Sequence, residues 1–404
     1  MIVPESGFPH RRSTATVDLV RLRENFRRVR ALGPANAPIC PMVKADAYGH
    51  GDVHVSRVLR AEGAEHLGVV ATEEGIRLRK AGDKGSILVF GGFHTVESIE
   101  ELIHENLTPV VCDWSQLQLL NERAGRIGRS EVAIHLEFDT GMGRLGFTVE
   151  EAVRLREWLN NHPRVKLRGV ATHFVRGEDL GVPGGDSERQ LQLFSRALAA
   201  FQGLRIEVHT LSSSSIVAGR RRSLENFGLK PADFGSPGMR PGISIYGEEP
   251  SANPDLQMGV KPVLRWASRL ARVHRVEKGG TISYNGTWRA PRESWIGVVP
   301  VGYADGFRRA LSNRGFILCR GRRAPVVGNV CMDYFMTDLT DVVRETGSLE
   351  AGEEVVIIGE QNGTSITANE VASWIQTISY EVLTGIGARV PRVYIESESE
   401  SGGA

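Results

Sequence analysis

The chain of 404 residues lacks several features that mark other classes of protein. It has no run of about 18 apolar residues, so we expect no transmembrane helix. Residues 1–10 contain no long apolar core, which argues against a secretory signal peptide and predicts a cytoplasmic protein. The formal net charge is +1, and the short basic run at residues 220–222 is typical of a solvated loop or helix end. We therefore expect neither a nucleic-acid nor a membrane partner.

Cysteine is also scarce, with four residues in the whole chain. The four positions show no spacing typical of a metal site, and they are too few for a disulfide framework; they are Cys40, Cys112, Cys319 and Cys331. Reduced thiols and no bound metal are the expectation. The sequence also shows no internal repeat, so we expect ordinary globular domains.

What is present is an alternation of short apolar runs with amphipathic segments. Hydrophobic residues make up 41% of the chain and charged residues 24%, as in soluble globular proteins. Eight strand-like runs lie at residues 39–43, 67–70, 87–90, 109–112, 132–138, 167–172, 206–211 and 242–246. Helix-like stretches lie between them at residues 72–81, 96–105, 116–124, 149–160 and 187–201. This alternation predicts an α/β fold with a (β/α)8 barrel of the TIM type, and a doubly wound open sheet is the alternative.

The pattern changes after about residue 255, where glycine turns separate short strands. The predicted strands lie at residues 270–276, 295–299, 316–319, 325–330 and 354–358, and one helix is predicted at 367–375. We therefore predict a barrel over residues 15–255 and a mainly β domain over 256–395, with residues 1–14 packing on the β domain. The polar tail at 396–404 is predicted to be disordered.

Lys44 lies where the first apolar run ends and a glycine-punctuated loop begins. Partial desolvation at such a position disfavours the ammonium form and lowers the pKa of the lysine. A neutral amine can condense with an aldehyde to form a Schiff base. The segment at residues 42–51, MVKADAYGHG, resembles the pyridoxal 5'-phosphate attachment site of the alanine racemases. The resemblance implies that Lys44 is the attachment lysine and that Tyr48 contacts the cofactor.

Other segments match the same family in the expected order. Arg144, in DTGMGRLG at residues 139–146, corresponds to the arginine that contacts the substrate carboxylate. His173 corresponds to the histidine against the pyridoxal ring, and Ser213 to a phosphate-binding serine. Taken alone, each of these residues would be read as an ordinary loop arginine, structural histidine or turn serine.

The segment MRPGISIYG, residues 239–247, is a further match. The resemblance places Arg240 against the pyridine nitrogen, and Gly242 and Ile243 at the phosphate through their backbone N–H groups. Arginine stays protonated and cannot give the ring a proton, so the cofactor would be a weaker electron sink than one paired with aspartate. Tyr380 corresponds to a phosphate-binding tyrosine.

The predicted β domain carries the remaining matches. Tyr284, in ISYNGTW at residues 282–288, corresponds to the second catalytic base, and Met332 and Asp333 correspond to substrate-pocket residues. A tyrosine needs neighbouring positive charge or hydrogen bonds to act near neutral pH. In the family this tyrosine reaches the barrel of a partner chain, so the resemblance implies a head-to-tail homodimer with shared active sites.

Two positions depart from the family pattern. Glu137 stands where many members have a lysine, often carbamylated, and Ser212 stands where asparagine is common. We hypothesise that Glu137 pairs with Arg144 directly. The substitution Glu137→Gln should then displace Arg144 and raise the KM for the substrate.

The resemblance implies an isomerase, an alanine racemase that interconverts L-alanine and D-alanine by two-base proton transfer on a pyridoxal-phosphate aldimine. Lys44 would take the proton from the D-isomer and Tyr284 from the L-isomer. The expected role is cytoplasmic D-alanine biosynthesis for peptidoglycan. A broad-specificity amino-acid racemase is the main alternative. A fold-related amino-acid decarboxylase and a non-catalytic pyridoxal-phosphate-binding protein are further ones, although such binding proteins lack the second domain.

Overall fold

The computed structural model describes residues 10–93, 95–219 and 237–396. The predictions made for residues 1–9, the basic run at 220–222 and the tail at 397–404 lie outside the described residues. The chain forms two compact units. One, the barrel unit, consists of residues 23–47 and 52–260, and the other, the β unit, consists of residues 1–22, 48–51 and 261–404. The chain therefore crosses between the units within α1 (Leu19–Leu32) and within the turn α2 (Lys44–Gly49).

The barrel unit is built on parallel strands, as the alternating pattern predicts. Seven strands are paired in chain order, each with the next: β2 (His66–Val69), β3 (Ser86–Val89), β4 (Thr108–Val111), β5 (Val132–Phe138), β6 (Val165–Thr172), β7 (Glu207–Ser212) and β8 (Gly238–Arg240). Residues 39–43 join the two ends of this sheet. Cys40 donates its N–H to the Met239 carbonyl of β8 at 2.8 Å, and Val43 donates to Gly68 of β2 at 2.8 Å. The first predicted strand thus closes the barrel.

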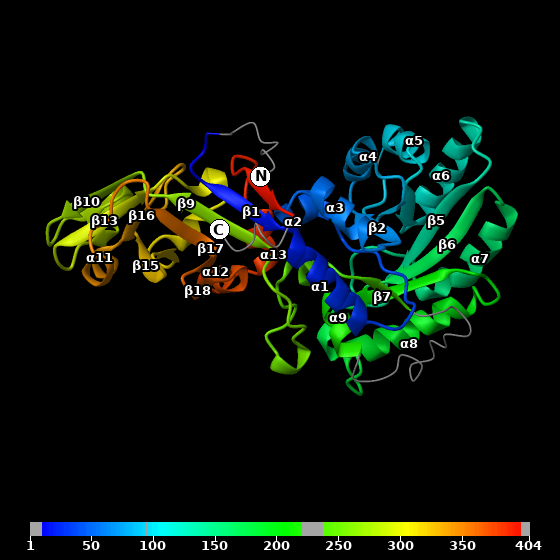
Figure 1. Ribbon diagram of the computed structural model, residues 1–404. Coiled ribbons are helices and arrows are strands. Elements are labelled where there is room, and N and C mark those ends of the chain that lie inside the picture. Colours follow the sequence, from blue (N-terminus) through cyan, green and yellow to red (C-terminus); the bar gives the residue numbers. More distant parts are fainter. Residues whose placement is uncertain (1–9, 94, 220–236, 397–404) are drawn as a thin grey trace. The chain divides into compact units, whose positions relative to one another are not determined.

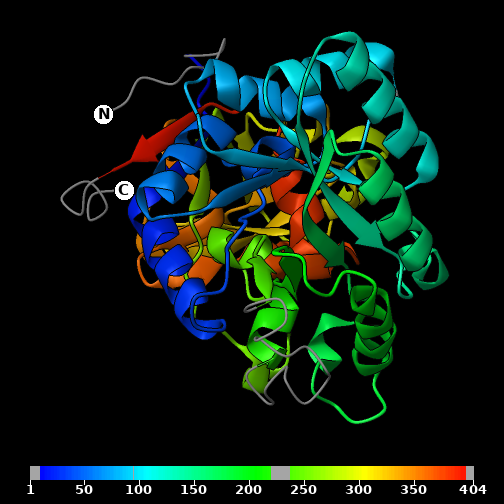
Figure 2. The same ribbon diagram turned by 90° about the vertical axis from the view of Figure 1, so that its right-hand side faces the viewer.

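Helices cover the outside of these strands (Figures 1 and 2). They are α3 (Asp52–Ala61), α4 (Thr72–Lys80), α5 (Val96–His104), α6 (Trp114–Arg126), α7 (Ala152–Asn161), α8 (Asp186–Ala199) and the short α9 (Ser213–Ala218). A capping box precedes α7, because Glu151 accepts the Thr148 backbone N–H at 2.8 Å. The fold class predicted from sequence is therefore confirmed.

One predicted strand is wrong. Residues 242–246 do not form the last barrel strand but contain a 3₁₀ turn, η5 (Ile243–Tyr246), in which all four residues are buried. The last strand is β8, which ends at Arg240. An apolar run of this length fits a buried strand and a buried helical turn equally well. Arg240 consequently terminates its strand, whereas the prediction placed it before one.

The β unit is a largely antiparallel sheet in the order β10-β13-β16-β15-β14-β17-β9-β1-β19, with β18 paired to β17. Its strands are β1 (Thr14–Asp18), β9 (Leu264–Arg269), β10 (Arg272–Val276), β13 (Ser294–Val299), β14 (Phe316–Cys319), β15 (Arg322–Val327), β16 (Phe335–Asp338), β17 (Glu354–Gln361), β18 (Thr364–Ile366) and β19 (Arg392–Ile395). A separate pair is β11 (Thr281–Ile282) with β12 (Trp288–Arg289). The unit also contains α11 (Thr340–Thr346), α12 (Ala368–Trp374) and α13 (Ser379–Thr384).

Strand β1 alters the predicted boundary between the two parts of the chain. It lies between β9, to which it is antiparallel, and β19, to which it is parallel. The buried Trp266 of β9 donates its indole N–H to the Ser13 hydroxyl at 2.8 Å, which fixes the start of this strand. Residues 15–22 therefore belong to the β unit, and not to the barrel as predicted. Within the described ranges, no helix combines the length and the apolar character needed to cross a membrane.

Candidate active site at the carboxyl ends of the barrel strands

Five of the predicted site residues lie at one end of the barrel unit. Lys44 follows the closing segment 39–43, and the loop bearing Arg144 follows β5. His173 directly follows β6, Ser213 directly follows β7, and Arg240 ends β8. Because all these strands are parallel, their carboxyl ends meet at the same rim, where barrel enzymes carry their chemistry. The structure therefore brings this part of the predicted site together.

The backbone beside Lys44 is held by a carboxylate that the sequence analysis did not identify. Glu74, in the first turn of α4, accepts the N–H of Ala45 at 2.7 Å through one oxygen. Its other oxygen accepts the N–H groups of Val70 and Ala71 at 2.8 and 3.1 Å. Glu74 thus joins the Lys44 turn to the start of α4. A helix start of this kind, a capping box, usually has serine or threonine three residues before the glutamate. Position 71 is alanine, so the usual sequence signature is missing.

The amine of Lys44 lies in an environment that favours its neutral form. Burial lowers the pKa of Lys44, and the nearby guanidinium of Arg144 lowers it further. The carboxylates of Glu74 and Glu137 oppose this shift without reversing it. The sequence analysis predicted a lowered pKa for Lys44, and the structure gives the same direction. The like charge of Arg144 is a second cause beside burial.

The turn that follows Lys44 is left-handed. Ala45, Asp46, Ala47 and Tyr48 have φ values of 53°, 54°, 52° and 55°. For residues with a Cβ this conformation costs about 1–2 kcal/mol each, so four in succession are a substantial local strain. The N–H of Ala47 donates to the Val43 carbonyl at 2.9 Å, and the N–H of Asp52 donates to the Asp46 carboxylate at 3.0 Å. These bonds help to hold a conformation that the sequence does not favour.

His173 and Arg240 contact each other at the rim. Arg240 Nη2 donates to the Thr172 carbonyl at 2.7 Å and lies 3.5 Å from His173 Nδ1. Burial lowers the pKa of His173 to about 3, and the positive charges of Arg240, Arg144 and Lys44 contribute. His173 is therefore a neutral imidazole at physiological pH. The α8 side chain of Gln190 donates to the His173 carbonyl at 3.0 Å, which positions this residue.

Arg240 keeps one donor free. The residue is 6% exposed, and its Nη1 is buried without a hydrogen-bond partner among the described residues. Burial lowers the pKa of Arg240, but an arginine side chain remains protonated in proteins. A buried, charged N–H without an acceptor is costly. This atom therefore fits an acceptor nitrogen or oxygen of a bound group.

The rim also has a compact hydroxyl and amide cluster. Ser213 Oγ accepts the N–H of Gly242 at 3.0 Å and the hydroxyl of Ser244 at 3.0 Å. Ser212, the predicted departure from the family, is engaged in its own turn, where its Oγ lies 3.1 Å from Ser215 Oγ. Hydroxyls and backbone N–H groups of this kind suit phosphate oxygens. The sequence analysis named Ser213 and Gly242, which are joined here, whereas Ser244 was not predicted.

The loop that carries Arg144 is short, and hydrogen bonds hold it at both ends. Asp139 accepts the N–H groups of Gly141 and Gly143 at 2.9 and 3.1 Å, and the loop closes where Phe147 donates to the Glu137 carbonyl at 2.8 Å. Burial acts to raise the pKa of Asp139, but its backbone donors lower it overall. Arg144 itself is exposed at this loop.

The hypothesised pair between Glu137 and Arg144 does not form in this structure. No ion pair between the two is found in the described part of the chain, and the buried Glu137 carboxylate instead accepts from Cys112 Sγ at 3.9 Å. Burial raises the pKa of Glu137, opposed by the charges of Arg240 and Arg144. Glu137 is buried in β5 whereas Arg144 is exposed on the loop, so the predicted contact is not made.

The remaining predicted residues belong to the β unit. Tyr48 and Tyr380 lie together there, with ring centroids 5.9 Å apart, and burial raises the pKa of Tyr380 to about 12. Tyr284, in the short 3₁₀ turn η7 (Tyr284–Gly286), is 71% exposed, and Met332 is 53% exposed. Asp333 is paired with Arg389 at 2.7 Å.

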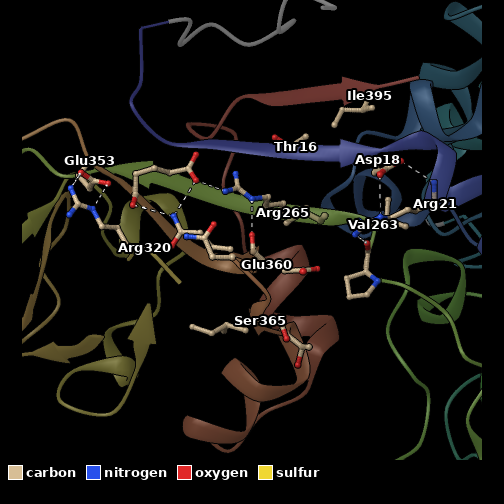
Figure 3. A pocket seen from close by; sticks show the side chains of 18 residues that line it. Thr16, Asp18, Arg21, Val263, Arg265, Arg320, Glu353, Glu360, Ser365 and Ile395 are labelled. Atoms are coloured by element: carbon tan, nitrogen blue, oxygen red, sulfur yellow. Dashed lines mark hydrogen bonds and ion pairs between the residues drawn. The ribbon is translucent and has the colours of Figure 1, made fainter. Parts of the chain in front are cut away.

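The β unit also contains a cavity of about 680 Å³ that holds none of the predicted site residues (Figure 3). Six of its seven charged side chains are paired with each other, and the seventh is Glu360. Arg265 is 2.5 Å from Glu354, and Arg320 is 2.9 Å from Glu353. Because these pairs satisfy their own charges, this cavity offers less for catalysis than the barrel rim.

Comparison with known proteins agrees with the geometry of the rim. The family model described as alanine racemase, N-terminal domain, matches residues 17–250, and that of the C-terminal domain matches residues 263–394. An alanine racemase of Geobacter sulfurreducens is 38% identical over 95% of this chain and 97% of the relative. The solved alanine racemase from E. faecalis has a TM-score of 0.85 at 30% identity, covering 98% of this chain and 100% of that one. The structure of alanine racemase from Bartonella henselae with covalently bound pyridoxal phosphate has a TM-score of 0.81 at 26% identity, covering 95% and 99%. This chain belongs to the alanine racemase family.

Proposed function

We propose that this protein interconverts L-alanine and D-alanine with pyridoxal 5'-phosphate, and that the barrel rim is its catalytic centre. The observation that carries the proposal is the convergence of Lys44, His173, Ser213 and Arg240 at the carboxyl ends of the strands. The resemblance assigns each of these residues to the cofactor site, and family membership supplies the reaction.

The residues of the rim fit the cofactor. The free Nη1 of Arg240 matches the pyridine nitrogen, and Ser213 with the backbone of Gly242 and Ile243 suits the phosphate. When bound, the cofactor supplies an aldehyde that takes up an amine and a ring that stabilises negative charge at the α-carbon. We place Lys44 as the covalent attachment, and Tyr48 and Tyr380 as further cofactor contacts.

The chain's own residues then perform the proton transfers. Lys44, whose pKa is lowered, takes the α-proton from one face of the amino acid and can return it there. Arg144 binds the substrate carboxylate. His173 stays neutral and accepts or donates hydrogen bonds without adding charge, and Arg240 keeps its proton. The arginine therefore limits how strongly the ring draws electrons, which favours prompt return of the proton to the α-carbon.

Tyr284 is proposed as the base on the opposite face. Its backbone is held firmly, because Asn329 donates to the Tyr284 carbonyl at 2.8 Å and Ser283 donates to the Asn329 carbonyl at 2.6 Å. Its side chain, in contrast, is 71% exposed within its own chain. A fixed but exposed tyrosine suits a residue that enters the site of a partner chain. We therefore propose a head-to-tail homodimer in which Met332 and Asp333 also complete the partner's substrate pocket.

We further propose that the protein acts in the cytoplasm, where its D-alanine is used for peptidoglycan. The test is growth of a D-alanine auxotroph carrying this gene in medium without D-alanine. Failure to grow, with active enzyme present in the cells, would contradict this role.

The central experiment is a racemisation assay on the purified protein with each enantiomer of alanine, beside serine, lysine and arginine. We expect activity on both enantiomers of alanine and a visible absorption band from the lysine-bound cofactor. Lys44→Ala should lose the band and lower activity by about 10⁴-fold or more. Lys80→Ala, at the exposed end of α4, is the matched control and should keep both.

Two results would contradict the proposal. One is a band that persists in Lys44→Ala, and the other is equal activity on the larger amino acids, which would identify a broad-specificity racemase. The dimer has its own test: mixing inactive Lys44→Ala with inactive Tyr284→Phe should restore part of the activity if each site draws on two chains. No recovery after subunit exchange would show that each site belongs to one chain.

A further inference from the structure

A second group of ionisable side chains meets inside the barrel, toward the amino ends of the strands. His66 begins β2, Glu207 begins β7, and His209 lies two residues further along β7. His135 lies in the middle of β5. Strands β2, β5 and β7 are not neighbours in the sheet, so these side chains meet across the barrel interior. That interior is usually filled by branched apolar residues.

The donor atoms of this cluster converge on one carboxylate. His66 Nε2 lies 2.9 Å and His209 Nε2 lies 3.0 Å from the same oxygen, Oε2 of Glu207. One potential ligand atom from each of His135, Glu207 and His209 lies within 4.8 Å of the other two. The rings of His135 and His209 have centroids 5.1 Å apart. Two imidazoles therefore contact a single carboxylate, and a third ring, that of His135, lies close by.

The two central imidazoles are buried and incompletely hydrogen-bonded. His135 is 2% exposed and His209 is 1% exposed. Nδ1 of each ring is buried and has no hydrogen-bond partner among the described residues. These Nδ1 atoms lie beside glycines of neighbouring strands, and it is Nε2 of His209 that faces Glu207. The side chain of Glu207, in contrast, is 37% exposed and gives the cluster an opening to solvent.

Glycines on the neighbouring strands make room for both rings. Gly169 of β6 is the register partner of His135, and a Cβ placed there would lie 2.3 Å from His135 Nδ1. Gly238 of β8 is the register partner of His209, and a Cβ there would lie 2.6 Å from His209 Nδ1. Any side chain at either position would collide with an imidazole. The backbone around the cluster is thus shaped to accommodate it.

We propose that His135, Glu207 and His209 bind a divalent transition-metal ion, with His66 as a fourth donor beside the same carboxylate. Imidazole nitrogen and carboxylate oxygen together suit Zn²⁺, with bonds of about 2.0–2.2 Å. In a tetrahedral site such bonds separate neighbouring ligand atoms by about 3.3 Å. The two separations of 2.9 and 3.0 Å are close to that value, and His135 has a ligand atom within 4.8 Å of those of Glu207 and His209. The ion would link three non-adjacent strands, and it is independent of the reaction at the rim.

The experiment uses the full-length protein without a histidine tag, refolded with Zn²⁺ and then dialysed against metal-free buffer. Zinc per chain is measured by mass spectrometry of the metal. We expect about one zinc per chain, and a rise of about 3 °C in Tm when free zinc is a hundredfold above its Kd. Glu207→Gln and His135→Gln should each lose the zinc. His104→Gln, at the exposed end of α5, is the matched control and should retain it.

X-ray absorption at the zinc edge of the wild-type protein provides a test that needs no variant. We expect nitrogen and oxygen ligands at about 2.0 Å with the scattering of imidazole rings. Zinc at the level of protein-free buffer, sulfur ligands, or equal retention by Glu207→Gln and His135→Gln would each overturn the proposal. The outcome does not depend on racemase activity, because removing the cofactor should leave the zinc content unchanged.

Discussion

The two ends of the barrel both gather basic side chains, but they differ in the sign of the charge that they can accept. At the carboxyl rim, Lys44, Arg144 and Arg240 form no ion pair with a carboxylate among the described residues, and their positive charges help to lower the pKa of His173. At the amino end, two imidazoles contact the single carboxylate of Glu207, and His135 offers a third nearby. The rim is therefore suited to anionic groups such as phosphate and carboxylate. The amino end, with lone pairs and one negative charge, is suited to a cation.

The largest expected effect is at the rim. Arg240→Gln removes a buried positive charge that contacts Thr172 and His173, and should lower kcat for alanine by about 10²–10³-fold. The matched control is Arg168→Gln, at an exposed position on β6 whose guanidinium is paired with Glu131. Its kcat should stay within about twofold of wild type, as for surface changes worth a few tenths of a kcal/mol. Equal losses of kcat in the two variants would show that the charge of Arg240 contributes no more to catalysis than a surface charge does.

The next effect concerns the amino end and is read in stability. Gly169→Ala places a methyl group against His135, and should lower the free energy of unfolding by about 1–3 kcal/mol in urea denaturation. Gly219→Ala is the comparison, because its nearest neighbouring atom would be 3.5 Å away. We expect Gly219→Ala to be neutral or slightly stabilising. A neutral Gly169→Ala would mean that the imidazole of His135 has room to move.

A smaller effect is expected in the pH dependence of stability. The pKa of His173 is about 3 in the folded protein, lowered by burial and by Arg240, Arg144 and Lys44, against 6.5 for the ordinary side chain. Between these values the unfolded chain binds a proton that the folded chain does not, so stability falls as pH falls. From pH 6.5 to 5.5 this residue should contribute a loss of about 1 kcal/mol. His173→Gln should flatten that part of the profile, whereas His104→Gln should not.

The smallest expected effect tests the left-handed turn at the rim. Ala45→Gly relieves the strain of φ 53° at an exposed residue, and should raise the free energy of unfolding by about 0.5–1 kcal/mol. Ala61→Gly, at the exposed end of the right-handed helix α3, should lower it by about the same amount. The prediction is that the two substitutions change the free energy of unfolding in opposite directions. If both lower it, the turn is not strained.

Much of the barrel could be predicted because local patterns indicate each strand and helix, namely apolar runs, their spacing and capping residues. What could not be predicted depends on contacts distant in sequence. Strand β1 is defined by its pairing with β9 and β19, which lie near the other end of the chain. The run at Ile243–Tyr246 is buried on all sides, so its sequence does not distinguish a strand from a helical turn.

The site residues also divide into those that local sequence indicates and those that depend on contacts distant in sequence. Rim residues could be predicted because each stands beside a segment with a family motif. His66, His135 and Glu207 share no local motif and meet only through the register of three separated strands. Glu74 and Gln190 were missed for the same reason, since what they do is visible only in the hydrogen bonds that they make. Glu137 was noticed, but its partner depends on side-chain reach, which sequence does not show.

The left-handed turn after Lys44 also has a stereochemical meaning. Positive φ values near 50–55° are disfavoured for L-amino acids and favoured for their mirror images, so Ala45 and Ala47 adopt the backbone conformation natural to D-alanine. A protein assembled by chemical ligation with D-alanine at these two positions should therefore fold with less strain than the genetically encoded chain. The segment that would carry the cofactor therefore has a backbone conformation that D-amino acids favour, although ribosomes incorporate only the L-enantiomer.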